Sequence, residues 1–191
     1  CSDDTTTILY LDPQTSHLMR TDPRRRRTET LVAHPMTDYQ ITADLKDCLF
    51  LKDNQLFHFS RDTGKVTEIA TVQLSERYND PRCAQFAMSP SGRRVAHTSP
   101  VRTKNANGYE YESGRILHTI DPATGVKWRG SSVLETKGDV PFLTWTAQED
   151  AVTWCTWGEP PTTVQVPREA VLPQDAGGNV YGTFGTLHQR S

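Results

Sequence analysis

Long apolar runs are missing from this 191-residue sequence. The longest ones, such as ILYL at 8–11 and LFL at 49–51, have the length of a β-strand, whereas a membrane-spanning helix needs about 20 apolar residues. No stretch shows the apolar i, i+3, i+4, i+7 spacing of an amphipathic helix. Hydrophobic residues make up 35% of the chain and the mean hydropathy is −0.61. The sequence therefore predicts no membrane-spanning helix, while its length still allows a packed core.

Charge of one sign is not in excess either. The chain has 21 basic and 23 acidic residues and a formal net charge of −2, so no overall field favours nucleic acid, and we expect no nucleic-acid partner. One local exception is the basic block in TDPRRRRTET. It is interpreted either as a solvated loop between two repeats or as a docking patch for an acidic partner or a lipid headgroup. This block consists of Arg24, Arg25, Arg26 and Arg27.

Cysteine is scarce and has no metal-binding pattern. The four cysteines, Cys1, Cys48, Cys83 and Cys155, include no CxxC pair, so no zinc site is expected. Cys48 and Cys83 could form a disulfide in an oxidising compartment. Buried free thiols are the simpler interpretation of the internal cysteines.

Motifs for catalysis are missing too. The sequence has no GxSxG nucleophile motif, and its glycines fall in turns rather than in a phosphate-binding loop. We therefore predict no catalytic residue and no cofactor, and a non-enzymatic protein is favoured. Three histidines, His58, His97 and His118, fall in predicted strands and could bind a metal in a central channel. Their different places in the repeats favour ordinary strand histidines instead.

The sequence does contain a repeat. YLDPQTSH (10–17), HFSRDTGK (58–65) and HTIDPATGVK (118–127) each follow a short apolar strand and lead into another. Asp and Pro initiate such turns, and Gly64 and Gly125 permit a positive φ, so each segment predicts a β-hairpin.

A second unit lies between these hairpins, and it reads strand, polar turn, strand. It occurs at 40–53, 85–99 and 142–156. The two units together give four antiparallel strands per repeat, which is typical of a propeller blade. One interval is longer because it contains VRTKNANGYEYESG (101–114), which predicts a polar loop between second and third strands. We predict an all-β fold, a partial or small β-propeller built of four-stranded antiparallel blades.

Four segments resemble a known repeat family, among them DNQLFHFSRDTGKVTEIA (53–70) and, more loosely, ILYLDPQTSHLMRTD (8–22). SPSGRRVAHTS (89–99) and RILHTIDPATGVKWR (115–129) are similar to the strand pair and the hairpin of TolB-like, PD40-type (WD40-like) β-propeller repeats. The resemblance covers roughly residues 8–157. It implies a propeller fold but no single function, because such propellers serve as scaffolds, as periplasmic binding modules, and as parts of peptidases and oligogalacturonate lyases.

The chain divides into three predicted regions. Residues 1–7 form a polar tether, residues 8–167 carry the repeats, and residues 168–191 form an extended Gly-rich arm that either wraps a neighbour or is a flexible end. Two full and two partial blades are expected, which fits either a piece of a longer chain or an open arc whose edges a partner caps.

Aromatic residues mark candidate partner-binding positions. Trp145 and Trp154 are predicted to oppose each other across one hairpin, with Trp157 nearby. These side chains either pack in the core or form an exposed face that anchors a partner. Tyr109 and Tyr111 lie on the inserted loop at 101–114, where binding residues are expected on a rigid scaffold.

The functional prediction combines these features with the first residue. CSDDTTT (1–7) resembles the start of a processed bacterial lipoprotein, in which Cys1 carries acyl chains. We therefore expect a lipid-anchored, non-enzymatic scaffold subunit on the periplasmic side of a bacterial membrane, docked on a multi-subunit membrane-associated protein complex. The alternatives are a cytoplasmic fragment of a larger protein, or part of a propeller enzyme such as an oligogalacturonate lyase or a peptidase.

Overall fold

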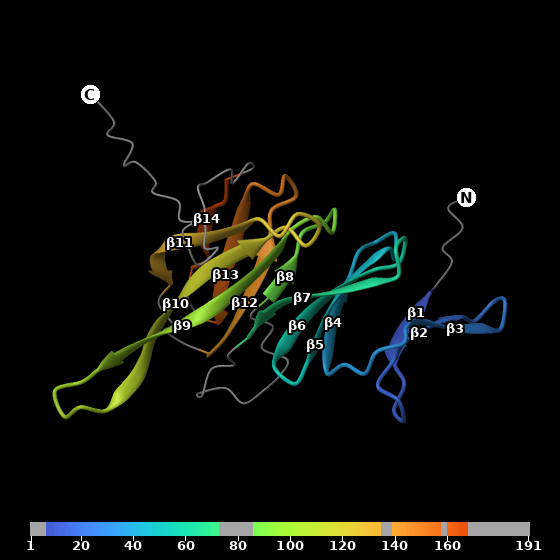
Figure 1. Cartoon of the computed structure of the whole chain (residues 1–191), viewed down its shortest axis with the longest axis horizontal. Coiled ribbons are helices and arrows are strands. Elements are labelled where there is room, and N and C mark those ends of the chain that lie inside the picture. Colours follow the sequence, from blue (N-terminus) through green and yellow to red (C-terminus); the bar gives the residue numbers. More distant parts are fainter. Residues whose placement is uncertain (1–6, 73–85, 135–138, 158–159, 168–191) are drawn as a thin grey trace. The chain divides into compact units, whose positions relative to one another are not determined.

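The computed structural model describes residues 7–72, 86–134, 139–157 and 160–167, and these form strands β1 to β14 (Figure 1). Across these described ranges every regular element is a β-strand, and there is no helix long and apolar enough to cross a membrane. The chain divides into two compact units, residues 1–70 and 71–191.

The first unit contains two antiparallel sheets. Sheet A has the order β1-β2-β3, and sheet B has the order β4-β5-β6-β7. The strands of sheet A are β1 (Ile8–Leu11), β2 (Leu18–Asp22) and β3 (Arg27–Val32). The strands of sheet B are β4 (Asp38–Ile41), β5 (Asp47–Lys52), β6 (Gln55–Ser60) and β7 (Lys65–Thr71).

The second unit also contains two antiparallel sheets. Sheet C has the order β11-β10-β9-β8, and sheet D has the order β12-β13-β14. The strands of sheet C are β8 (Phe86–Met88), β9 (Val95–Lys104), β10 (Glu110–Ile120) and β11 (Lys127–Leu134). The strands of sheet D are β12 (Asp139–Trp145), β13 (Ala151–Trp157) and β14 (Thr162–Gln165).

Two of the three hairpin turns of the repeat share one hydrogen-bonding scheme. Asp12 Oδ1 accepts the backbone N–H groups of Gln14 and Thr15 at 2.9 and 2.8 Å. Asp121 Oδ1 does the same for the two equivalent residues of its turn, at 2.8 and 3.1 Å. The fifth residue of each turn has a positive φ, 56° at Ser16 and 75° at Gly125. The Asp side chain thus replaces lost backbone partners, and the predicted hairpins are confirmed.

Each unit has its own apolar core. In the first unit, Leu18, Val32, Cys48 and Phe50 are buried together with Leu31 and Met36. In the second unit, three tryptophans are buried in one cluster with residues of both sheets, including Ala96, Leu117 and Val152. These tryptophans are Trp128, Trp145 and Trp154. Since alternate residues of each strand point inward, the strands place these side chains between neighbouring sheets.

Two predicted loops have a different structure. The basic block Arg24–Arg27 is not a loop between repeats, because Arg27–Val32 forms strand β3, which pairs with β2 within the same sheet. The segment 101–114 is not a loop either, because most of it continues β9 and β10 as a paired hairpin. Thr and Tyr favour strands, and here they flank a single turn. The polar composition of the segment predicted a loop, although these residues favour a hairpin.

Candidate functional site

The most prominent feature of the second unit is the hairpin formed by the far ends of β9 and β10, residues 101–114, called here the long hairpin (Figure 1). β8 pairs with β9 only as far as His97, and β11 pairs with β10 only as far as Arg115. Residues 101–104 and 110–114 therefore pair with each other alone among the described strands. The long hairpin projects beyond its sheet as a result.

The tip of the long hairpin is a specified turn. Asn105 Oδ1 accepts the backbone N–H groups of Asn107 and Tyr109 at 2.9 and 3.0 Å. Gly108 has a φ of 80°, and adding a Cβ there would meet no atom within 4 Å, so its backbone conformation is what requires glycine. The Asn-Gly pair thus closes the hairpin in a defined shape.

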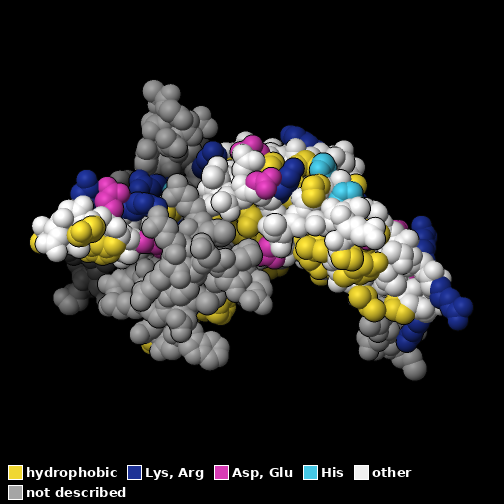
Figure 2. All heavy atoms as spheres, turned by 90° about the horizontal axis from the view of Figure 1, so that it is seen from below, with side chains coloured by type: hydrophobic (Ala, Val, Ile, Leu, Met, Phe, Trp, Pro, Cys, Tyr) yellow, Lys and Arg dark blue, Asp and Glu magenta, His cyan; other side chains and the backbone are white. Residues whose placement is uncertain are grey.

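Two tyrosines occupy the exposed part of this hairpin. Tyr109 is 72% exposed and Tyr111 is 51% exposed. An ion pair, Lys104 Nζ to Glu110 Oε1 at 3.4 Å, lies beside them. Figure 2 shows hydrophobic side chains at the hairpin end of the molecule, next to basic and acidic ones. Exposed tyrosines on a defined backbone provide the amphipathic contact area that protein interfaces favour.

The base of the long hairpin is held by a buried arginine. Arg115 is fully buried, its Nη1 lies 2.9 Å from Glu112 Oε1, and its Nε donates to Thr98 Oγ1 at 2.7 Å. Burial lowers the pKa of Arg115, and the Glu112 carboxylate opposes that shift. The pairing register shifts between Glu112 and Gly114. This bulge turns the Glu112 side chain toward the buried charge, so the hairpin leaves the sheet at a fixed point.

The histidines fall into two separate contacts. His97 and His118 stack with ring centroids 5.0 Å apart, and His118 Nε2 lies 2.7 Å from Ser99 Oγ. Burial lowers the pKa of His97 to about 3 and that of His118 to about 4, so both rings are neutral at pH 7. His58 Nε2 lies 3.1 Å from Asp47 Oδ1 in sheet B. Over the described ranges, no three His, Cys, Asp or Glu side chains are placed to share a metal ion.

The tryptophans are packing residues. Trp145 and Trp154 are 8% and 3% exposed, so the core-packing interpretation is confirmed for both and the alternative of an exposed face is wrong. Trp145 Nε1 donates to the carbonyl of Ala87 at 3.1 Å, which ties sheet D to sheet C. They do not oppose each other, since Trp145 pairs with Val152 and Trp154 pairs with Leu143. The side chain of Trp157 lies outside the described residues.

The basic block is split between a turn and a strand. Asp22 Oδ1 accepts the backbone N–H groups of Arg24 and Arg25 at 3.0 Å each, and Arg26 has a φ of 50°. Arg27 begins β3 and lies 3.7 Å from Glu29. Glu29, Arg20 and Arg61 gather at this block and were not among the predicted site residues. The only signal was the alternation of charged residues in Arg27–Val32, typical of an exposed strand face.

Several predicted positions lie outside the described residues. Cys1, with its predicted lipid, Cys83, and the arm at 168–191 are among them. Cys48 is a free, buried thiol, and burial raises its pKa to about 12. Cys155 is also free and is partly buried. The free-thiol interpretation is therefore confirmed for Cys48.

Comparison with known proteins supports the fold. No family model matches the sequence, and no curated protein matches it. An oligogalacturonate lyase from Vibrio parahaemolyticus is 11% identical with a TM-score of 0.51, over 86% of this chain and 47% of the lyase. An auxiliary nutrient binding protein from Bacteroides ovatus is 13% identical with a TM-score of 0.50, over 87% of this chain and 37% of that one. TolB from Acinetobacter baumannii is 15% identical with a TM-score of 0.49, over 82% of this chain and 37% of TolB.

This chain spans less than half the length of each of these proteins. At such low identity the likeness concerns the fold alone. The lyase is named as an enzyme and the protein from Bacteroides ovatus as a binding protein, so the fold by itself does not distinguish these two kinds of function. Together with the four-stranded sheets described above, the comparison shows that the chain is an all-β protein built of β-propeller blades.

Proposed function

We propose that this chain is a non-enzymatic interaction module that binds a protein partner through the long hairpin. The observation that carries this proposal is the projection of residues 101–114 beyond sheet C with Tyr109 and Tyr111 exposed. A tyrosine side chain contributes apolar contact area and a hydroxyl hydrogen bond at a low cost in conformational entropy. The paired strands of the hairpin also offer backbone groups along their outer edges, to which an extended partner segment can add.

The anchoring of the hairpin supports this role. Arg115 and Glu112 hold its base, and the Asn105 turn holds its tip. A preorganised contact element loses less entropy on association than a flexible loop does. A lipid anchor at Cys1, a periplasmic location and membership of a multi-subunit membrane complex remain predictions from the sequence. The propeller-enzyme alternative likewise stays a prediction from the sequence.

Site-specific photocrosslinking in the native cell tests the proposal. A photoreactive residue at position 109 is expected to capture one dominant protein, whereas the same residue at position 10 captures none of it. Tyr10 is a matched control because it is 37% exposed on β1 of the first unit, whereas the hairpin belongs to the second unit. With the captured protein purified, Tyr109→Ser should weaken its affinity by about tenfold or more. Equal affinity of the Tyr109→Ser and Tyr10→Ser variants would refute the role of the hairpin.

A further inference from the structure

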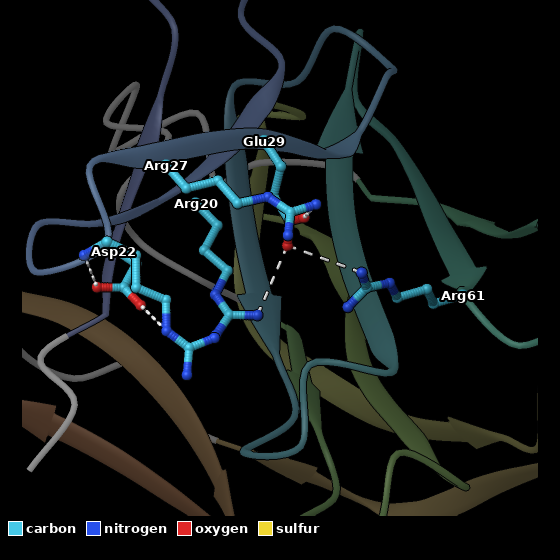
Figure 3. Close-up of a pocket in the computed structure, with 6 residues that line it drawn as sticks. Arg20, Asp22, Arg27, Glu29 and Arg61 are labelled. Carbon is cyan, nitrogen blue, oxygen red and sulfur yellow. Dashed lines mark hydrogen bonds and ion pairs between the residues drawn. The ribbon is translucent and has the colours of Figure 1, made fainter. Parts of the chain in front are cut away.

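The first unit contains a cavity lined entirely by charged side chains. Its volume is about 320 Å³. Three segments build it: strand β2, the turn and strand β3 that follow, and the turn after β6. The lining residues are Arg20, Asp22, Arg25, Arg27, Glu29 and Arg61 (Figure 3). It shares no residue with the long hairpin and is therefore independent of the proposed protein-binding function.

Local structure explains why these side chains converge. Arg20 and Glu29 face each other across the β2–β3 pairing. Arg27 lies two residues before Glu29 on the same strand, so both point to one face of sheet A. Arg61 comes from the turn after β6, where its backbone N–H donates to the carbonyl of Lys46 at 2.7 Å. Figure 3 shows the Glu29 carboxylate between the guanidinium groups of Arg20 and Arg61.

The charges in the cavity do not balance. Four guanidinium groups face two carboxylates, an excess of two positive charges. Asp22 Oδ1 is committed to the turn, and Asp22 Oδ2 lies 3.5 Å from Arg25 Nε. Glu29 therefore has to serve three arginines, Arg20 at 3.5 Å, Arg27 at 3.7 Å and Arg61 at 3.8 Å.

These ion pairs are loose. Charge-assisted hydrogen bonds between guanidinium and carboxylate are about 2.7–2.9 Å long, and the contacts to Glu29 are 3.5 to 3.8 Å. The Arg20 and Arg61 side chains are 32% and 46% exposed, whereas that of Arg27 is 74% exposed. The two Glu29 oxygens cannot saturate the five N–H donors that each of these three arginines carries, so the guanidinium groups retain donor capacity for a further oxyanion.

We propose that this cavity binds a small phosphate monoester. A phosphate monoester carries a charge between about −1.5 and −2 at pH 7 and has three strong acceptor oxygens, which matches the excess of two positive charges. Guanidinium groups from three segments can each donate a pair of N–H hydrogen bonds to the phosphate oxygens. The volume exceeds that of a phosphate group alone and lies at the lower end of small-ligand pockets, which are about 300–1,000 Å³. The organic part of the ester fills the remaining space.

Calorimetric titration of the full chain tests this. Glycerol 3-phosphate at low ionic strength is expected to bind saturably, and added salt should weaken it because exposed charges are screened. Arg61→Gln and Arg27→Gln should each lower the affinity by about tenfold. Arg27 is mostly exposed, so its substitution tests the site without risk to folding. The matched control is Arg93→Gln, which removes the same charge from an exposed position of the second unit and should change nothing.

A second titration distinguishes a lipid headgroup from a soluble ester as the source of the phosphate. Vesicles containing phosphatidic acid present the same group at a membrane surface. Arg61-dependent binding that is tighter to vesicles than to glycerol 3-phosphate would assign a lipid headgroup, and the reverse order would assign a soluble ester. Absence of saturable binding to both probes, or equal affinities of Arg61→Gln, Arg27→Gln and Arg93→Gln, would overturn the proposal.

Discussion

The Arg94 guanidinium lies over the Trp145 indole, 5.1 Å from the ring centroid. The same side chain donates to the carbonyl oxygens of Glu149 and Pro167, and Arg94 belongs to the turn between β8 and β9. The arginine thus comes from a turn of sheet C. The Trp145 ring lies in sheet D, and the two carbonyl acceptors lie in segments next to the strands of sheet D. One side chain thereby fastens two blades of the second unit to each other.

The first prediction concerns this fastening. Arg94→Ala removes the cation–π contact and two charged hydrogen bonds, so the second unit should lose about 1–3 kcal/mol of unfolding free energy. Arg94→Lys keeps the charge but cannot reach both carbonyls, and should lose part of that amount. Urea unfolding followed by tryptophan fluorescence measures it, because all four tryptophans follow residue 127. Arg93→Ala, an exposed neighbour, is the control, and an equal loss in both would contradict the assignment.

The second prediction concerns the stacked histidines. The folded pKa values, about 3 for His97 and about 4 for His118, lie below the ordinary value of 6.5. At a pH between the folded and the ordinary pKa values, the unfolded chain binds protons that the folded chain does not. The stability of the fold therefore decreases as the pH falls below 6.5. From pH 7 to pH 5 the second unit should lose roughly 2–4 kcal/mol, measured by urea unfolding.

A histidine variant separates this effect from general acid sensitivity. His118→Gln should flatten the dependence between pH 7 and pH 5, because one of the two depressed groups is gone. His34→Gln, on an exposed residue of the first unit, should leave the slope unchanged. A wild-type stability that does not change over this range would show that the pair is protonated without cost.

The third prediction concerns the bulge at the base of the long hairpin. A Cβ added at Gly114 would lie 2.4 Å from a Val133 methyl carbon and 2.7 Å from the Leu134 carbonyl oxygen. The backbone oxygen cannot move aside easily, so Gly114→Ala should cost about 1–3 kcal/mol. Ser131→Ala, an exposed position on β11, should cost less than about 0.5 kcal/mol. Thermal unfolding of both variants provides the comparison, and a neutral Gly114→Ala would show that β11 can shift.

The fourth prediction concerns the ion pair below the hairpin. Glu112→Gln removes the carboxylate that lies 2.9 Å from the fully buried Arg115 guanidinium, and should destabilise the second unit by about 1–3 kcal/mol. Arg115→Met in addition should recover part of that loss, since the buried charge is then gone. Glu110→Gln removes the carboxylate of an exposed pair and should change stability by less than about 1 kcal/mol. Chemical unfolding measures all three, and equal effects of Glu112→Gln and Glu110→Gln would argue against a special role for Arg115.

The sequence by itself determined the strands and most of the turns. Asp12 and Asp121 form the same side-chain turn in two repeats because hydrogen bonds within a few residues decide it. The four-stranded pattern, and with it the blade architecture, could be predicted from such local signals. The position of each histidine within its blade was predictable for the same reason.

Only the tertiary structure decided the register and the long-range clusters. Trp145 faces Val152 instead of Trp154 because the turn at 146–150 sets the offset, with a positive φ at Glu149 and a hydrogen bond from Thr146 to Ala151. Glu29 gathers Arg20 and Arg61 only when sheets A and B are both in place. Local patterns specify backbone conformation, whereas side chains from distant segments meet through packing, which no single segment encodes.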